Sequence, residues 1–101
     1  MEPIKKQLAE NVILVGTKPF MSYMKSVNTL FRSKNLKEIE IKARGNNIKK
    51  AIDIVESSRR KFCHDLNLQI KNITLGTEQF TSKEDNKVIS VSTIAIFLLK
   101  I

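Results

Sequence analysis

Two segments of this chain share one pattern: a run of apolar or alternating residues meets a glycine, and apolar residues at helical spacing follow. The runs are 11–15 and 36–43, and the helically spaced segments after them are 20–31 and 48–62. Short runs of this kind favour β-strands, and apolar residues three and four apart favour helices. Each strand is therefore predicted to pass through a glycine corner into a helix, which gives a β-α-β-α order.

The rest of the chain predicts two more strands. In segment 66–75, apolar residues share one parity up to Ile70 and the other from Ile73, so we expect a strand with a bulge near 71–72. A polar stretch separates it from 88–100, a long apolar strand that returns beside it as a hairpin. The predicted order is βαβαββ, an α+β fold.

The length of 101 residues and a hydrophobic content of 42% fit one packed domain, which we place at residues 11–101 after a flexible arm at residues 1–10. No apolar run reaches membrane-spanning length, and residues 1–10 lack the apolar stretch of a secretion signal. Cys63 is the single cysteine, which fits a reducing compartment. We therefore expect a cytoplasmic protein with no membrane partner.

The formal net charge of +8 is concentrated in one third of the chain. Between Gly16 and Lys50, nine lysines and arginines stand against two glutamates, so this segment carries +7. General solubility is the alternative explanation, but solubility alone does not require such a concentration. We therefore favour a binding site for a polyanion with repeating phosphates, which indicates a nucleic acid.

Both glycine corners place lysines where a helix begins. Lys18 precedes the first predicted helix, and Lys49 and Lys50 lie in the first turn of the second, where the helix dipole favours acidic residues. Three tolerated surface lysines are the alternative, but an unfavourable choice repeated at two helix starts is typical of an anion site. The predicted phosphate-binding residues of the two corners are Gly16, Lys18, Pro19, Lys42, Arg44, Gly45, Asn46, Asn47, Lys49 and Lys50.

The uncharged residues of the corners also have structural interpretations. Pro19 is predicted to stand in the first turn of its helix, behind a capping residue at 17–18. Asn46 and Asn47 either cap the second helix or donate a hydrogen bond to phosphate, and the two roles compete for one side chain. Gly45 is expected to adopt a conformation that a β-carbon would hinder, or to let a phosphate approach closely.

No group of residues has the spacing of a catalytic site. Cys63 and His64 are neighbours on a predicted helix, so they point about 100° apart and are too few for zinc. Asp53 and Glu56 are spaced to hold a metal, but ordinary pairing with nearby cations is the better interpretation. We predict no enzyme, no cofactor and no metal site.

The aromatic residues are predicted to lie in the core. Phe20, Tyr23, Phe31 and Phe62 recur at core spacing and do not alternate with cations as a base-stacking surface would.

The last strand, 88–100, is apolar on both faces. One face carries Ile94, Ile96 and Leu98, and the other carries Ala95, Phe97 and Leu99. Either the second face contacts another subunit, or the chain's own helices and loops bury it.

A set of short motifs covering residues 12–100 resembles the Alba family of small basic chromatin proteins in order and spacing. The motifs are Val15-Gly16-Thr17-Lys18-Pro19, Met21-Ser22-Tyr23, Ile41-Lys42-Ala43-Arg44-Gly45, Lys50-Ala51-Ile52-Asp53, Arg59-Arg60-Lys61-Phe62, Leu75-Gly76-Thr77 and Val91-Ser92-Thr93-Ile94. The resemblance implies two helices on a four-stranded mixed sheet, a two-layer sandwich similar to the C-terminal domain of bacterial translation initiation factor 3. It also implies dimers that bind double-stranded DNA and RNA without marked sequence preference.

By this resemblance, the Lys18 corners of two subunits meet in a central basic surface, which Lys42, Arg44 and residues 46–49 extend along the phosphates. The hairpin between the last two strands reaches toward the minor groove as an arm. Its tip carries Lys83 and Lys87, which we include among the nucleic-acid-binding residues, against Glu84 and Asp85.

Three functions follow, in order of preference. The first is a dimeric, sequence-nonspecific double-stranded DNA-binding protein that coats and compacts chromosomal DNA at the nucleoid or chromosome. The second is an RNA-binding protein in translational control or in a ribonucleoprotein of the ribonuclease P type. The third is a protein-interaction scaffold. The expected partners are a homodimer mate or a paralogue in a heterodimer, with higher assembly through Phe62 and the last strand.

Overall fold

The computed structural model describes residues 10–101. The arm predicted for residues 1–10 lies outside the described residues except for Glu10, which stands in a turn. The elements are β1 (Val12–Leu14), α1 (Phe20–Asn28), β2 (Glu38–Arg44), α2 (Ile48–Ser57), β3 (Leu68–Thr81) and β4 (Val88–Lys100). Single turns adjoin the helices, namely η2 (Thr29–Ser33), η3 (Gly45–Asn47), η4 (Ser58–Phe62) and η5 (His64–Leu66). The βαβαββ order is confirmed.

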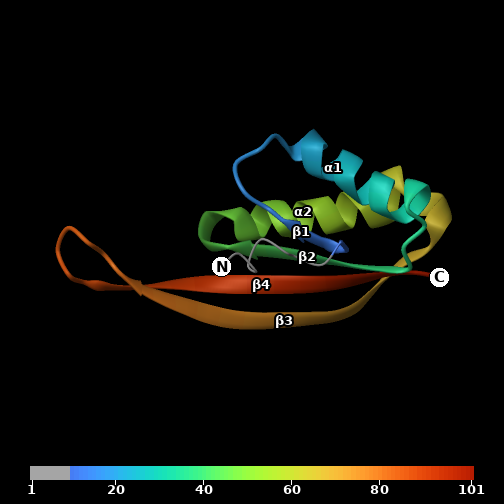
Figure 1. The fold of residues 1–101 in the computed structure, drawn as a ribbon. Helices are drawn as coiled ribbons and strands as arrows, with labels where there is room; N and C mark the ends of the chain where they lie inside the picture. Colours follow the sequence, from blue (N-terminus) through green and yellow to red (C-terminus); the bar gives the residue numbers. More distant parts are fainter. Residues whose placement is uncertain (1–9) are drawn as a thin grey trace.

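The strands form one sheet in the order β1-β2-β4-β3, and both helices cover the same face (Figure 1). β1 pairs parallel with β2, while β4 pairs antiparallel with β2 and β3. A parallel pair needs a crossover, which α1 supplies, whereas the antiparallel β3 and β4 are joined directly by the loop 82–87. The molecule is therefore an α+β two-layer sandwich of two helices on a four-stranded mixed sheet.

β3 and β4 continue past the helices as an arm, which we define as the hairpin from Thr77 to Ser92 (Figure 1). The sequence predicted that β3 would end near residue 75, but its polar residues stay paired with β4 as far as Thr81. Every β3 residue after Leu68 is exposed. Backbone pairing rather than burial therefore holds this part of the strand.

The predicted bulge lies at Lys71. The pairing of β3 with β4 passes from Ile70 opposite Leu98 to Asn72 opposite Phe97, and Lys71 has no partner. The extra residue reverses the parity of the strand, so Ile73 returns to the face that Ile70 occupies. The bulge thereby keeps the apolar side chains of β3 on the helix side of the sheet.

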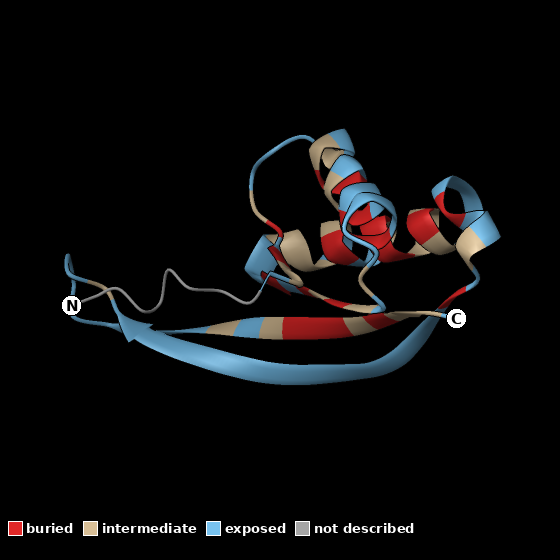
Figure 2. Ribbon diagram, turned by 45° about the vertical axis from the view of Figure 1, so that its right-hand side comes forward, coloured by how far each residue is buried: buried red, intermediate tan, exposed pale blue. Residues whose placement is uncertain are grey.

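The core lies between the helices and β1, β2 and β4 (Figure 2). Alternate residues of β2 and β4 point into it, and α1 and α2 contribute one apolar side each. Tyr23 and Phe31 are buried in this core, and Phe20 packs against it half-buried, as predicted. No helix of the described chain is long and apolar enough to cross a membrane.

The prediction that Phe62 lies in the core is wrong, because half of its surface is exposed. The cause is η4, which has π-helical geometry and a wider turn than an α-helix. This turn shifts the phase of the apolar side by about one residue. Cys63 takes the core position, with 1% of its surface exposed, and burial raises the pKa of its thiol.

The second face of β4 lies on the side of the sheet away from the helices. Its Ala95 is buried, and Phe97 and Leu99 are half-buried. The helices cover only the face that carries Ile94, Ile96 and Leu98, so they do not bury this side. Contact of this face with another subunit stays a prediction.

Candidate nucleic-acid interface

The first corner is the loop from Gly16 to Pro19, which links β1 to α1. Thr17 and Lys18 are exposed. Pro19 itself is the residue before the first turn of α1, with an extended backbone, and its carbonyl accepts a hydrogen bond from the N–H of Ser22 at 3.0 Å. The prediction of a cap at 17–18 with Pro19 inside the helix is therefore wrong. The fixed φ of proline suits the extended backbone here.

The Tyr23 side chain closes this loop from α1. Its hydroxyl oxygen accepts hydrogen bonds from the backbone N–H of Gly16 at 2.7 Å and of Lys18 at 3.2 Å. Only 5% of Tyr23 is exposed, so these bonds form at the edge of the core. The predicted core role of Tyr23 is confirmed, and its hydroxyl has a second role that the apolar spacing did not indicate.

Lys50 reaches the same loop from the first turn of α2. Its Nζ donates to the carbonyl of Gly16 at 2.8 Å and to that of Lys18 at 3.1 Å. The ammonium also lies 5.7 Å from the centre of the Tyr23 ring, within the range of a cation–π contact. The two glycine corners, about thirty residues apart in sequence, are thus joined by Lys50.

The second corner turns at Gly45, which has a φ of +58°. A β-carbon there would lie 3.4 Å from Val91 Cγ1 on β4, in addition to the strain of the left-handed conformation. The expected conformational role of Gly45 is confirmed. Asn46 is exposed and Asn47 half-buried, and Asn47, the residue before α2, makes no side-chain capping bond, so its capping alternative is wrong.

Two of the predicted cations lie on the outer face of β2, the face away from the helices. Lys42 and Arg44 are exposed there, on either side of the buried Ala43. The Nη1 of Arg44 contacts Glu78 Oε1 of β3 at 2.8 Å, an ion pair exposed on both sides. Lys42 and Lys18 form no ion pair within the described residues 10–101. Among the cations of the two corners, these two lysines are therefore the most available to an external anion.

Lys49 projects into solvent from the first turn of α2, with 86% of its side chain exposed. Its Nζ contacts Asp53 Oδ2 at 2.8 Å, one helical turn along, and this hydrogen bond raises the pKa of Lys49. Because so exposed a pair contributes little to stability, phosphate can displace Asp53 at small cost.

An open groove runs along the outer face of the sheet and brings several corner residues together. Its volume is about 780 Å³, and all four strands contribute to it. Gly16, Lys42, Arg44 and Asn47 of the predicted set line it, together with Leu14 and Glu78. The groove therefore adjoins both corners.

Lys83 and Lys87 lie elsewhere, at the tip of the arm. Figure 1 shows that the arm projects from the same end of the molecule as the two corners, so the tip lies far out from them. Within the tip, Asp85 Oδ1 accepts a hydrogen bond from the N–H of Lys87, and Ser82 Oγ from that of Glu84. These two lysines lie in a separate region, where Glu84 and Asp85 offset their charge.

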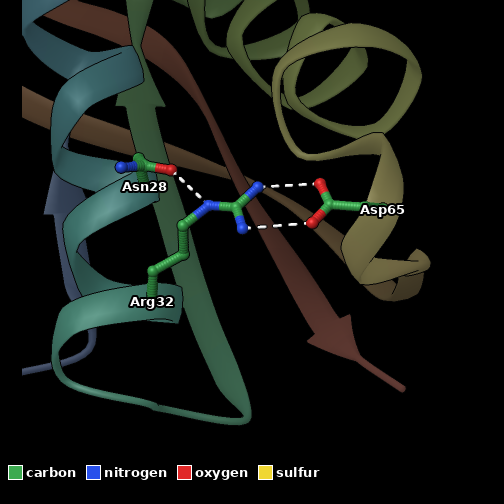
Figure 3. Close-up of polar contacts among 3 residues, drawn as sticks. All are labelled: Asn28, Arg32 and Asp65. Carbon is green, nitrogen blue, oxygen red and sulfur yellow. Dashed lines mark hydrogen bonds and ion pairs between the residues drawn. The ribbon is translucent and has the colours of Figure 1, made fainter.

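At the opposite end of the helices, Arg32 is bound within the chain. Its guanidinium donates to both carboxylate oxygens of Asp65, at 2.8 and 3.1 Å, and its Nε donates to Asn28 Oδ1 at 2.6 Å (Figure 3). The hydrogen bond from Arg32 lowers the pKa of Asp65. Arg32 counts toward the basic third of the sequence but lies apart from the corners, joining η2 to η5.

Comparison with known proteins agrees with this architecture. The Alba family model matches residues 11–77. The chain is 42% identical over 91 residues to "DNA/RNA-binding protein Alba" of Methanococcus maripaludis, which covers 90% of this chain and 99% of that protein. It is 41% identical over 93 residues to "DNA/RNA-binding protein Alba 1" of Archaeoglobus fulgidus, covering 92% and 99%.

Solved structures give the same result. Alba from Thermoplasma volcanium superposes with a TM-score of 0.78 at 40% identity, covering 89% of this chain and all of that one. ALBA1 from Trypanosoma brucei gives a TM-score of 0.68 at 22% identity over 92% of this chain and 71% of that one, which shows a shared fold alone. On the family match and the extent of these identities, the chain belongs to the Alba family.

Proposed function

We propose that this protein binds nucleic acid through the phosphate backbone, at the surface formed by its two glycine corners. The main support for this proposal is that Lys50, at the second corner, contacts the loop of the first. Lys18, Lys49 and the β2 cations therefore lie at one end of the molecule. The curated relatives bear the name DNA/RNA-binding protein, which supports this assignment. The role we propose is binding rather than catalysis.

The side chains of this surface suit phosphate without selecting a base sequence. Lysines act as mobile point charges, and Arg44 offers a planar group for two phosphate oxygens. Contacts to phosphates position a protein on a duplex but carry no sequence information. Tyr23, the aromatic residue at the first corner, is buried and is not available to stack on bases. These features support sequence-nonspecific binding to double-stranded DNA, which the protein would coat and compact on the chromosome or nucleoid.

We further propose that the working unit is a dimer. β3 is an edge strand, and its Ile70, Ile73 and Leu75 point to the helix side of the sheet but remain exposed, Leu75 by 79%. Ile52 of α2 is also exposed. A second copy, or a paralogue in a heterodimer, would cover this apolar surface. The half-exposed Phe62 and the outer face of β4 would then serve higher assembly.

One observation favours RNA as the alternative ligand. The tip of the arm holds two lysines against Glu84 and Asp85, and so has no net charge. Insertion into a narrow minor groove of DNA relies on cations, which this tip does not supply in excess. The corners would serve the phosphates of A-form RNA equally well, in translational control or in a ribonucleoprotein of the ribonuclease P type.

The test is the affinity of the purified protein for matched DNA and RNA duplexes across a salt series. If a dimer makes about six to eight phosphate contacts, the logarithm of the binding constant should fall with that of salt at a slope of roughly −5 to −7. The double variant Lys18→Ala/Lys49→Ala should flatten that slope. A wild-type affinity that does not change with salt would refute the proposal, and the preferred duplex decides between chromosomal and RNA functions.

A further inference from the structure

We propose that Tyr23 and Lys50 act together as a clamp that holds the loop Gly16–Lys18 in the conformation that presents Lys18 to phosphate. In this assignment Lys50 is a positioning residue rather than a phosphate ligand. The inference rests on the proposed function for its binding consequence, and on the contacts of the loop for its mechanism.

The clamp binds both kinds of backbone group in the loop. The Tyr23 hydroxyl oxygen accepts hydrogen bonds from the N–H groups of Gly16 and Lys18, and the Lys50 ammonium donates hydrogen bonds to the carbonyls of the same two residues. Four backbone groups of a three-residue loop are therefore bound by two side chains from two different helices. A loop held at both donors and acceptors has little freedom to change conformation.

The two side chains of the clamp also support each other. The Tyr23 ring is buried against the core and presents its face to the Lys50 ammonium. The half-buried Lys50 thereby has two carbonyls and one aromatic face around its charge. These contacts account for a lysine in the first turn of α2, a position where the helix dipole alone would disfavour it.

The clamp should change affinity without changing the number of phosphates contacted. A mobile loop must be ordered when nucleic acid binds, and that entropy cost lowers affinity. A loop already ordered by the clamp avoids the cost. Removing the Tyr23 hydroxyl takes away no charge, so the salt dependence should stay as it was. A direct ligand behaves differently, because its removal lowers the slope.

The main experiment uses Tyr23→Phe in the full chain. Amide hydrogen exchange at Gly16 and Lys18, measured without nucleic acid, should become about tenfold faster or more, while amides in the core stay protected. Affinity for a DNA duplex should fall about three- to tenfold, the size of one net hydrogen bond, with an unchanged salt slope. In a Lys18→Ala background the same substitution should no longer change affinity.

Charge variants separate positioning from direct contact. Lys50→Arg should retain most of the loop protection, whereas Lys50→Met should lose it. Lys25→Met removes an equal charge from an exposed site on α1 and is the matched control. If Lys50→Met lowers affinity equally in the presence and absence of Lys18, Lys50 is a direct ligand and the proposal fails.

Two further outcomes are distinct. Unchanged exchange at Gly16 and Lys18 in Tyr23→Phe would overturn the clamp, whatever the wild type binds. Faster exchange in a protein whose wild type binds no duplex would overturn the proposed function instead, while the clamp would stand as the determinant of loop conformation. A thermal melt of each variant checks that it folds.

Discussion

The two ends of the helical layer use the same residue types in opposite ways. At the far end, Arg32 and Arg59 lie in the last turns of their helices, where cations suit the dipole, and each contacts a carboxylate. Lys100 donates there to the carbonyl of Phe31 and to Asn35 Oδ1. At the corner end, lysines stand where helices begin, and Lys18 and Lys42 pair with no described acidic residue.

This difference distinguishes structural charge from charge available for binding. Cations at the far end complete the fold, and their removal should weaken stability. At the corner end, Lys18 and Lys42 contribute little to the fold and are open to an external anion, whereas Lys50 holds the first loop. A count of basic residues in the sequence mixes the two sets, whereas their partners in the structure separate them.

The largest effect should come from removing the available charges. Lys18→Ala/Lys42→Ala should lower duplex affinity about a hundredfold at physiological salt and, for a dimer, reduce the salt slope by about 4. Lys34→Ala/Lys37→Ala removes the same charge from exposed residues at the far end and should leave the slope nearly unchanged. Salt-series titrations of both variants measure this. Equal slopes would show that net charge, not the corners, drives binding.

The second effect concerns backbone strain at the corner. Gly45→Ala should destabilise the protein by about 1–2 kcal/mol, because alanine must adopt a left-handed conformation close to Val91. For a domain of this size that is a fall in Tm of about 5–10 °C. Asn67→Gly is the far-end comparison: Asn67 has the same φ of +58°, and glycine there should not lower Tm. Thermal unfolding followed by circular dichroism measures both Tm values. An unchanged Tm in Gly45→Ala would contradict the proposed strain at this corner.

A smaller effect, confined to stability, should follow from Arg32→Met. The pKa of Asp65 is lowered by Arg32, so the pair stabilises the fold above the usual aspartate pKa of 3.8 and is lost as pH falls through the lower folded value. The variant should therefore have a lower Tm than wild type at pH 7, and this difference in Tm should disappear in acid. Its duplex affinity should match wild type. A difference in Tm that persists below the folded pKa of Asp65 would mean that Arg32 stabilises the protein through packing.

The smallest effect should be a gain. Arg44 Nη1 donates a hydrogen bond to Glu78 Oε1 at 2.8 Å, and Glu78→Gln would remove this ion pair and free the guanidinium to bind phosphate. We expect affinity to rise about two- to threefold with a slightly steeper salt slope, the size of an exposed ion pair. The matched change at the far end, Asp65→Asn, should leave affinity unaltered. Competition binding at fixed salt resolves changes of this size, and weaker binding by Glu78→Gln would show that Glu78 orients Arg44 for the ligand.

The sequence predicted the fold well where burial follows a regular period. The alternation in β2 and the parity change around Lys71 report directly on which side of a sheet is covered. Two errors arose where no such period exists. Phe62 was misplaced because the π-helical turn η4 changes the helical phase, and the end of β3 was misplaced because backbone pairing carries the strand past its last apolar residue.

The candidate site was predictable in part. Glycine and lysine at two strand-to-helix corners are local signals, and Gly45 adopts a left-handed backbone conformation, which a β-carbon would hinder, as predicted. The contacts of Lys50 and Tyr23 with the first loop are not local: they depend on how α1 and α2 pack against β1. No spacing in the sequence indicates that a core tyrosine directs its hydroxyl to a loop seven residues earlier.

The bulge in β3 sets the direction of the arm rather than the faces of its residues. The side chain of Lys71 only pairs with Glu38 on the surface, so many residues should substitute for it. Deletion of Lys71 would place Asn72 directly after Ile70, opposite the same β4 residues as now, so every later residue of the strand would keep its face. What the deletion would remove is the local bend and the added twist of a bulged strand. The arm would then leave the sheet at another angle, and relatives that lack this residue should carry their hairpins in a different direction.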